Sequence, residues 1–99
     1  MKTRRLAVGL IAGLASLAAA PAMAQDKVSL RLNWYVGGLH TPYYYGKELG
    51  YFRDAGIDLT INEGRGSANT VQVVAAGSDT FGMADSSSLI GLAAKGAEI

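Results

Sequence analysis

Strand-like and helix-like segments alternate along residues 28–95, and this alternation limits the fold more than any other feature of the sequence. Residues 28–33 and 57–62 carry apolar side chains at every second position, which is typical of strands with one buried face. A shorter third strand is predicted at 81–84. Because short loops separate these strands from the helix-like segments, the sequence predicts an α/β fold, with a parallel sheet flanked by helices.

The first predicted helix follows a glycine-containing loop. It begins at Thr41, whose hydroxyl is expected to cap it, and Pro42 occupies its first turn. Gly50 is placed to end it in a left-handed conformation. The expected buried stripe consists of residues three or four apart, namely Pro42, Tyr45, Leu49 and Phe52.

Two further helices are predicted downstream. One is capped by Ser67 and ends at Gly77, and the other covers residues 89–95 after a polar segment. Residues 97–99 are expected to enter a fourth strand. We therefore interpret residues 25–99 as the N-terminal part of a larger domain.

The first 24 residues have the pattern of a secretory signal peptide. Three basic residues within the first five are followed by an uncharged apolar run, and small residues end the segment at Ala24. A membrane anchor is the alternative, but a spanning helix needs about 20 apolar residues and has no cleavage site. The sequence therefore predicts cleavage after Ala24 and a periplasmic location.

The charge of the remaining chain argues against nucleic-acid binding. The whole sequence has nine basic and eight acidic residues, and three of the basic ones lie in the first five positions. Residues 25–99 therefore carry six basic and eight acidic side chains, whereas affinity for phosphate backbones requires clustered Lys and Arg. The absence of cysteine means that the fold does not depend on disulfides.

Polar and aromatic residues follow each of the three predicted strands. In an open parallel sheet, ligands bind outside the carboxyl ends of the strands, where these segments would meet. The candidate ligand-binding residues are Asn33, Trp34 and His40 after the first strand, Gly66 and Ser67 after the second, and Asp85 and Ser86 after the third.

Each candidate has a functional and a structural interpretation. Trp34 could stack on a heterocycle or belong to the core. The N–H groups at Gly66 and Ser67 could bind an anion or form an ordinary capped turn. Asp85 could accept a hydrogen bond from an amine or cap the third helix, and His40 could contact a ligand or hold its loop.

The sequence does not fit a dinucleotide-binding motif, a zinc site or a serine hydrolase. Gly64 and Gly66 begin a dinucleotide fingerprint, but Asn69 stands where a glycine or alanine is needed. One histidine without cysteine offers no zinc cluster, and His40 is the one possible base for the serines at 86–88. We therefore expect no cofactor, no metal, no catalytic residues and no enzyme activity.

Several short motifs at consistent spacing resemble the opening of the SsuA/THI5-like substrate-binding proteins. They are Leu32-Asn33-Trp34 with His40 and Pro42, residues 46–52, residues 55–59, Gly66-Ser67, residues 74–77 and Phe81-Gly82. The resemblance implies a type II periplasmic binding fold, of which this chain would supply a partial first lobe. It also implies a monomeric solute-binding protein that delivers a small solute to the permease and ATPase of an ABC transporter.

Members of this family bind thiamine pyrimidine precursors, alkanesulfonates, taurine or nitrate. Asn33, Trp34 and His40 look most similar to the pyrimidine-binding branch. Asp85 suits the exocyclic amine of an aminopyrimidine and would repel a sulfonate or nitrate. The alternatives are a sulfonate, taurine or nitrate receptor, and a THI5-type thiamine pyrimidine synthase.

Overall fold

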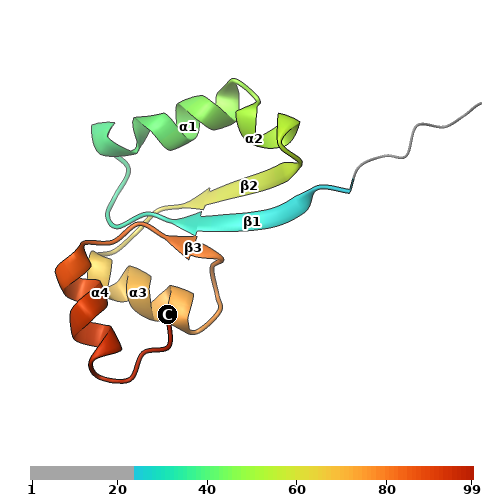
Figure 1. The fold of residues 1–99 in the computed structure, drawn as a ribbon. Coiled ribbons are helices and arrows are strands. Elements are labelled where there is room, and N and C mark those ends of the chain that lie inside the picture. Colours follow the sequence, from blue (N-terminus) through green and yellow to red (C-terminus); the bar gives the residue numbers. More distant parts are fainter. Residues whose placement is uncertain (1–23) are drawn as a thin grey trace, which may run out of the picture.

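Three parallel strands form one sheet in the order β2-β1-β3 in the computed structural model, which describes residues 24–99 (Figure 1). The central strand β1 (Asp26–Arg31) pairs with β2 (Ile57–Asn62) along six residues. Its other side pairs with β3 (Phe81–Gly82) at Leu30 and Arg31. The chain thus moves to opposite sides of β1, and the switch point of the sheet lies between β1 and β3.

Helices cover both faces of the sheet (Figure 1). The helices α1 (Thr41–Glu48) and α2 (Tyr51–Asp54) lie on one face, and α3 (Ser67–Ala75) and α4 (Ser86–Ala93) lie on the other. A short 3-10 helix, η1 (Gly38–His40), leads into α1. This arrangement confirms the predicted α/β class and is consistent with part of a periplasmic-binding-like fold.

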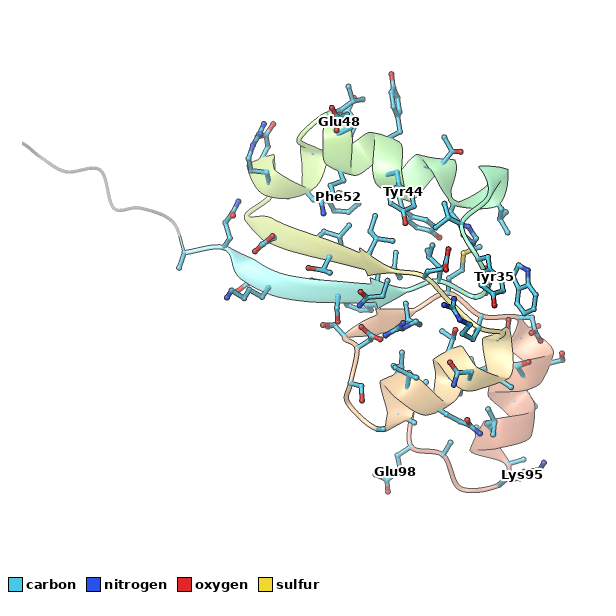
Figure 2. The ribbon with its side chains drawn as sticks, turned by 180° about the vertical axis from the view of Figure 1, so that it is seen from behind. Tyr35, Tyr44, Glu48, Phe52, Lys95 and Glu98 are labelled. Carbon is cyan, nitrogen blue, oxygen red and sulfur yellow. The ribbon has the colours of Figure 1, made fainter. Side chains whose placement is uncertain are left out.

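The alternating residues of the strands line the sheet face beneath α1 and α2. They surround an apolar cavity of about 240 Å³, lined by Val28, Leu30, Tyr43, Phe52, Ile57, Leu59 and Phe81. Figure 2 shows Phe52 on the sheet side of the helices. Burial of this apolar face explains why a period of two identified the strands.

Close contact joins α3 to the opposite face of the sheet. Thr70 is fully buried, and its Oγ1 donates a hydrogen bond of 2.7 Å to the carbonyl oxygen of Leu32. A Cβ atom at Gly82 would lie 2.7 Å from the Thr70 side chain and 2.9 Å from that of Val74. Glycine at 82 therefore allows β3 to pack directly on α3.

The first predicted helix is divided into α1 and α2. Gly50 has a φ of 79°, so its predicted left-handed conformation is confirmed, and α2 begins at the next residue. The predicted buried stripe is wrong, because Pro42, Tyr45 and Leu49 are exposed. Three consecutive tyrosines at 43–45 place aromatic carbon on several sides of α1, so spacing alone could not identify the buried side.

The predicted hydroxyl caps are also wrong. Thr41 and Ser67 are the first residues of α1 and α3, and neither helix has a side-chain cap. The Ser67 hydroxyl instead accepts a hydrogen bond of 3.0 Å from the backbone N–H of Asp85. A tertiary contact therefore uses the oxygen that we assigned to a local cap.

The boundaries after residue 80 differ from those predicted. The third strand covers two residues rather than 81–84, and α4 starts at Ser86 rather than Leu89 because Asp85 accepts a hydrogen bond from the Ser88 N–H. No strand is assigned at 97–99, where the Ala97 N–H donates to the carbonyl of Leu92.

Most of the predicted signal peptide, residues 1–23, lies outside the described part of the chain. Between residues 24 and 99, each helix is too short or too polar to cross a bilayer.

The buried carboxylate of Asp79 connects polar side chains at the ends of β1 and β2. Asp79, with a side chain 2% exposed, accepts hydrogen bonds from Arg31 Nε at 2.8 Å and Asn62 Nδ2 at 2.7 Å. Burial by itself raises the pKa of Asp79, but the hydrogen bonds from Arg31 and Asn62 outweigh it and hold the pKa below its usual value.

We expect Asp79→Asn to destabilise the full-length protein by about 1–3 kcal/mol at pH 7, because hydrogen bonds to a charged group are lost. The carboxylate stabilises the fold fully above its unfolded pKa of about 3.9, and this contribution disappears as the pH falls through the lower folded pKa. Urea unfolding from pH 7 to pH 2 should therefore show that the free energies of unfolding of wild type and Asp79→Asn become equal in acid. The exposed Asp58→Asn serves as control, and a pH-independent difference would contradict this assignment.

Candidate functional site

The loops that follow β1 and β2 are hydrogen-bonded to each other at the carboxyl edge of the sheet. The Gly64 N–H donates to the carbonyl of Trp34 at 3.0 Å, and the Gly66 N–H donates to that of Asn33 at 2.8 Å. A Cβ atom at Gly64 would collide with the Leu32 carbonyl oxygen and lie 2.7 Å from the Asn33 carbonyl carbon. Glycine at 64 is therefore required by this close approach of two backbones.

The loop after β3 joins the same edge. Its connection is the hydrogen bond from the Asp85 N–H to Ser67 Oγ. Ser86, the first residue of α4, is exposed beside it. The structure therefore brings the three predicted segments together at one edge of the sheet, which we call the rim (Figure 1).

Trp34 is exposed at the rim. The residue is 56% exposed, and its ring meets the ring of Tyr35 edge-on at 5.2 Å between centroids. A Cβ atom at Gly66 would be 3.8 Å from the Trp34 ring, so the indole lies close to this glycine. Of the two interpretations from sequence, exposure favours a ligand-stacking surface over a core position.

His40 is buried and holds Asn33 in a defined orientation. The Gly37 N–H can only donate, so the His40 Nδ1 atom, 3.1 Å away, is the acceptor. A neutral imidazole then carries its proton on Nε2 and donates it to Asn33 Oδ1 at 2.8 Å. Both ring nitrogens are engaged, so the geometry supports the structural role of His40.

This orientation leaves the amide nitrogen of Asn33 available. Its oxygen faces His40, and within residues 24–99 its NH2 group makes no hydrogen bond. A half-buried amide donor with a fixed direction can recognise a carbonyl oxygen or a heterocyclic nitrogen.

Asp85 caps α4 and retains one acceptor position. Its Oδ1 accepts hydrogen bonds from the Ser87 hydroxyl and the Ser88 N–H, and its Oδ2 accepts one from the Ser88 hydroxyl. These bonds from Ser87 and Ser88 hold the pKa of Asp85 well below its usual range. A carboxylate offers about four acceptor positions, so this exposed anion can cap the helix and still accept one donor.

The predicted anion site at Gly66 and Ser67 has fewer free donors than expected. The Gly66 N–H is directed to the Asn33 carbonyl, and the Ser67 hydroxyl receives the Asp85 N–H. Both residues therefore connect the loops of the rim.

Sequence reasoning missed two charged residues at the rim. Arg65 places its guanidinium carbon 4.4 Å from the centroid of the Tyr35 ring and donates to Glu63 Oε1 at 2.9 Å. Glu63 Oε2 accepts a hydrogen bond of 3.1 Å from the Val36 N–H, which together with Arg65 lowers the pKa of Glu63. An acid and a base after β2, together with aromatic residues after the neighbouring strand β1, could have indicated this contact.

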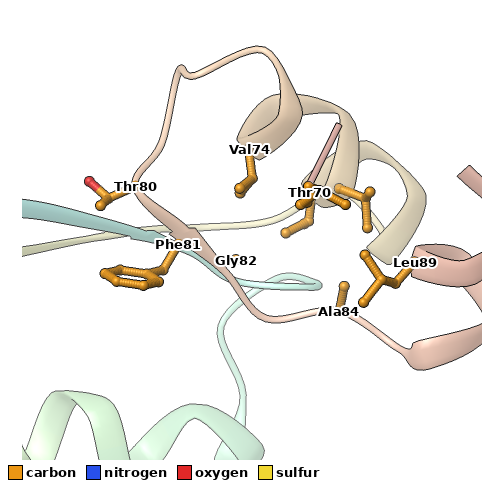
Figure 3. A pocket seen from close by; sticks show the side chains of 9 residues that line it. Thr70, Val74, Thr80, Phe81, Gly82, Ala84 and Leu89 are labelled. Atoms are coloured by element: carbon orange, nitrogen blue, oxygen red, sulfur yellow. The ribbon is translucent and has the colours of Figure 1, made fainter. Parts of the chain in front are cut away.

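A separate cavity of about 350 Å³ lies between α3, β3 and α4 (Figure 3). Its lining residues are Thr70, Val71, Val74, Thr80, Phe81, Gly82, Ala84, Leu89 and Ile99. None of the predicted ligand-binding residues lines it. Among residues 24–99, no three potential metal-ligating side chains come together.

Comparisons with known proteins give matches to one group of enzymes. Each relative below is named as a 4-amino-5-hydroxymethyl-2-methylpyrimidine phosphate synthase. The protein from Legionella pneumophila is 32% identical over 59 residues, which cover 60% of this chain and 19% of the relative. The synthase THI5 from Saccharomyces cerevisiae is 28% identical, and the synthase from Candida albicans is 30% identical. Each match extends over 61 residues, which cover 62% of this chain and 18% of the relative.

The chain thus spans about a fifth of the length of these relatives. No solved structure matches it significantly. The names of the relatives contradict our expectation that the protein is not an enzyme, because each describes a synthase.

A family model described as NMT1/THI5 like matches residues 38–99. This match covers well over half of the chain, so the chain belongs to the NMT1/THI5-like family.

Proposed function

We propose that the full-length protein is a thiamine-pyrimidine synthase of the kind named among its relatives, and that the rim binds the aminopyrimidine. The observation that carries this proposal is the set of complementary groups at the rim. A 4-aminopyrimidine has a flat ring, ring nitrogens that accept hydrogen bonds and an exocyclic amine that donates them. The exposed Trp34 ring, the free amide donor of Asn33 and the remaining acceptor of Asp85 match these three features.

A second candidate is a periplasmic receptor that binds the same heterocycle for import. The observation that favours it is the leader, with its basic start, apolar run and small residues before Gln25. In this proposal a monomeric receptor captures the solute between two lobes and delivers it to a membrane permease with its ATPase. Both candidates require the rim to recognise an aminopyrimidine, so they differ in what happens to the ligand.

Binding can be tested on the full-length protein, expressed with its own leader. Native mass spectrometry should detect a retained aminopyrimidine or its phosphate. Calorimetric titration should give tighter binding for 4-amino-5-hydroxymethyl-2-methylpyrimidine than for an alkanesulfonate, because Asp85 repels anions. Tighter sulfonate binding would overturn the assignment of the ligand.

The two candidates separate in a second measurement. Formation of the pyrimidine phosphate by cytosolic protein, without added pyrimidine, would support the synthase. The product can be detected by liquid chromatography and mass spectrometry. Exported protein that starts at Gln25 and binds the pyrimidine without producing it would support the receptor.

A further inference from the structure

We infer that Glu63 and Arg65 form a clamp that positions the Trp34 ring for its ligand. The inference rests on the proposed function in one respect, namely that the ligand stacks on Trp34. Neither charged residue needs to touch the ligand. Both act through the loop that carries Trp34, so they are positioning residues.

The contacts of the clamp form a closed path between the two loops. The Trp34 ring packs edge-on against Tyr35, and the guanidinium of Arg65 covers the face of the Tyr35 ring. Arg65 is paired with Glu63, and the second carboxylate oxygen of Glu63 accepts the N–H of Val36. The path therefore begins and ends in the loop after β1 and holds that loop at two points.

Residues 34–36 need contacts from outside their own loop to fix their orientation. Trp34, Tyr35 and Val36 are all about half exposed, and they lie between buried Leu32 and buried His40. Figure 2 shows Tyr35 at the end of the sheet where the loops emerge. An exposed ring that is already oriented loses less side-chain freedom when a ligand binds, so the clamp should strengthen binding by preorganisation.

The charges of the clamp support positioning over direct recognition of an anion. Glu63 and Arg65 neutralise each other at 2.9 Å, and Arg65 Nη1 also donates to the carbonyl of Gly64. The pair adds no net charge to the rim, whereas Asp85 remains a free anion there. Asp85, and not the clamp, therefore determines the preference of the rim for a cationic or amine-bearing ligand.

The test uses full-length protein labelled with 5-fluorotryptophan, in which the Trp34 resonance is assigned by its loss in Trp34→Phe. Arg65→Ala should shift or broaden this fluorine resonance in the ligand-free protein. It should also weaken aminopyrimidine binding by roughly 3–10-fold, as expected for loss of an exposed cation–π contact and ion pair. Glu63→Gln is the second variant and should move the same resonance if Arg65→Ala folds poorly.

A control variant separates the clamp from general effects. Arg53→Ala removes an exposed arginine from α2 and should leave the Trp34 resonance and the affinity close to wild type. An unchanged Trp34 resonance in both Arg65→Ala and Glu63→Gln would overturn the inference. This holds even if the affinity falls, because such a fall would mean that Arg65 contacts the ligand directly.

The test also distinguishes the clamp from the proposed function. If wild-type protein binds no aminopyrimidine but Arg65→Ala still moves the Trp34 resonance, the clamp stands and the proposed ligand is wrong. If the pyrimidine binds and neither variant moves the resonance, the ligand stands and the clamp is wrong.

Discussion

Replacement of Gly64 by alanine should destabilise the full-length protein by at least about 2–3 kcal/mol, the upper range for one added methyl group in a packed site. The new Cβ would collide with the backbone of residues 32 and 33, which cannot rotate away as a side chain could. Leu32 is fully buried, and Thr70 holds its carbonyl oxygen. Relief of the collision would therefore separate the loops after β1 and β2, and ligand binding at the rim should be lost with it.

The same substitution at Gly91 provides a matched control. Gly91 lies within α4, and a Cβ atom there would have no neighbour within 4 Å. Gly91→Ala should stabilise the protein by about 0.5–1 kcal/mol, because alanine is the better helix former. Both variants can be compared with wild type by urea unfolding and calorimetric titration. A free energy of unfolding for Gly64→Ala equal to that of wild type would show that the two loops need not approach closely.

The sheet could be predicted because its signal is local. Residues 57–62 alternate, and β2 has these boundaries. Gly50 and Gly77 were predicted to end helices, and each has a positive φ. The side-chain caps of α1 and α3 were not predictable in this way. The Ser67 hydroxyl, for example, accepts a hydrogen bond from the N–H of Asp85, a residue 18 positions away.

The rim could be predicted as a region, since the carboxyl ends of parallel strands meet at one edge. Its internal contacts could not be predicted. The hydrogen bond between His40 and Asn33 depends on the path of the intervening loop, and the clamp depends on the approach of Glu63 to Val36. The expectation of no enzyme activity was wrong for a further reason, because the same fold can support both receptors and enzymes.

Trp34→Ala should weaken aminopyrimidine binding by about 1–3 kcal/mol while the fold is largely retained, because the stacking surface is lost from an exposed position. A buried tryptophan would behave differently, since its replacement by alanine costs roughly 3–5 kcal/mol of stability. Trp34 is 56% exposed, so we expect thermal melts close to wild type. Tyr45→Ala is the control, because Tyr45 is a similarly exposed aromatic residue on α1, and this variant should bind normally.

Asp85→Asn should separate ligand recognition from helix capping at the same residue. Asparagine caps helices about as well as aspartate, so α4 should keep its start and the melting temperature should change little. Loss of the negative charge should weaken binding of the aminopyrimidine by roughly tenfold or more, as for a charged hydrogen bond, and reduce the repulsion of an alkanesulfonate.

Titration of both ligands into wild type, Trp34→Ala and Asp85→Asn measures these effects. Unchanged pyrimidine affinity in Asp85→Asn would restrict Asp85 to its capping role, and a large fall in melting temperature for Trp34→Ala with unchanged affinity would return Trp34 to the core.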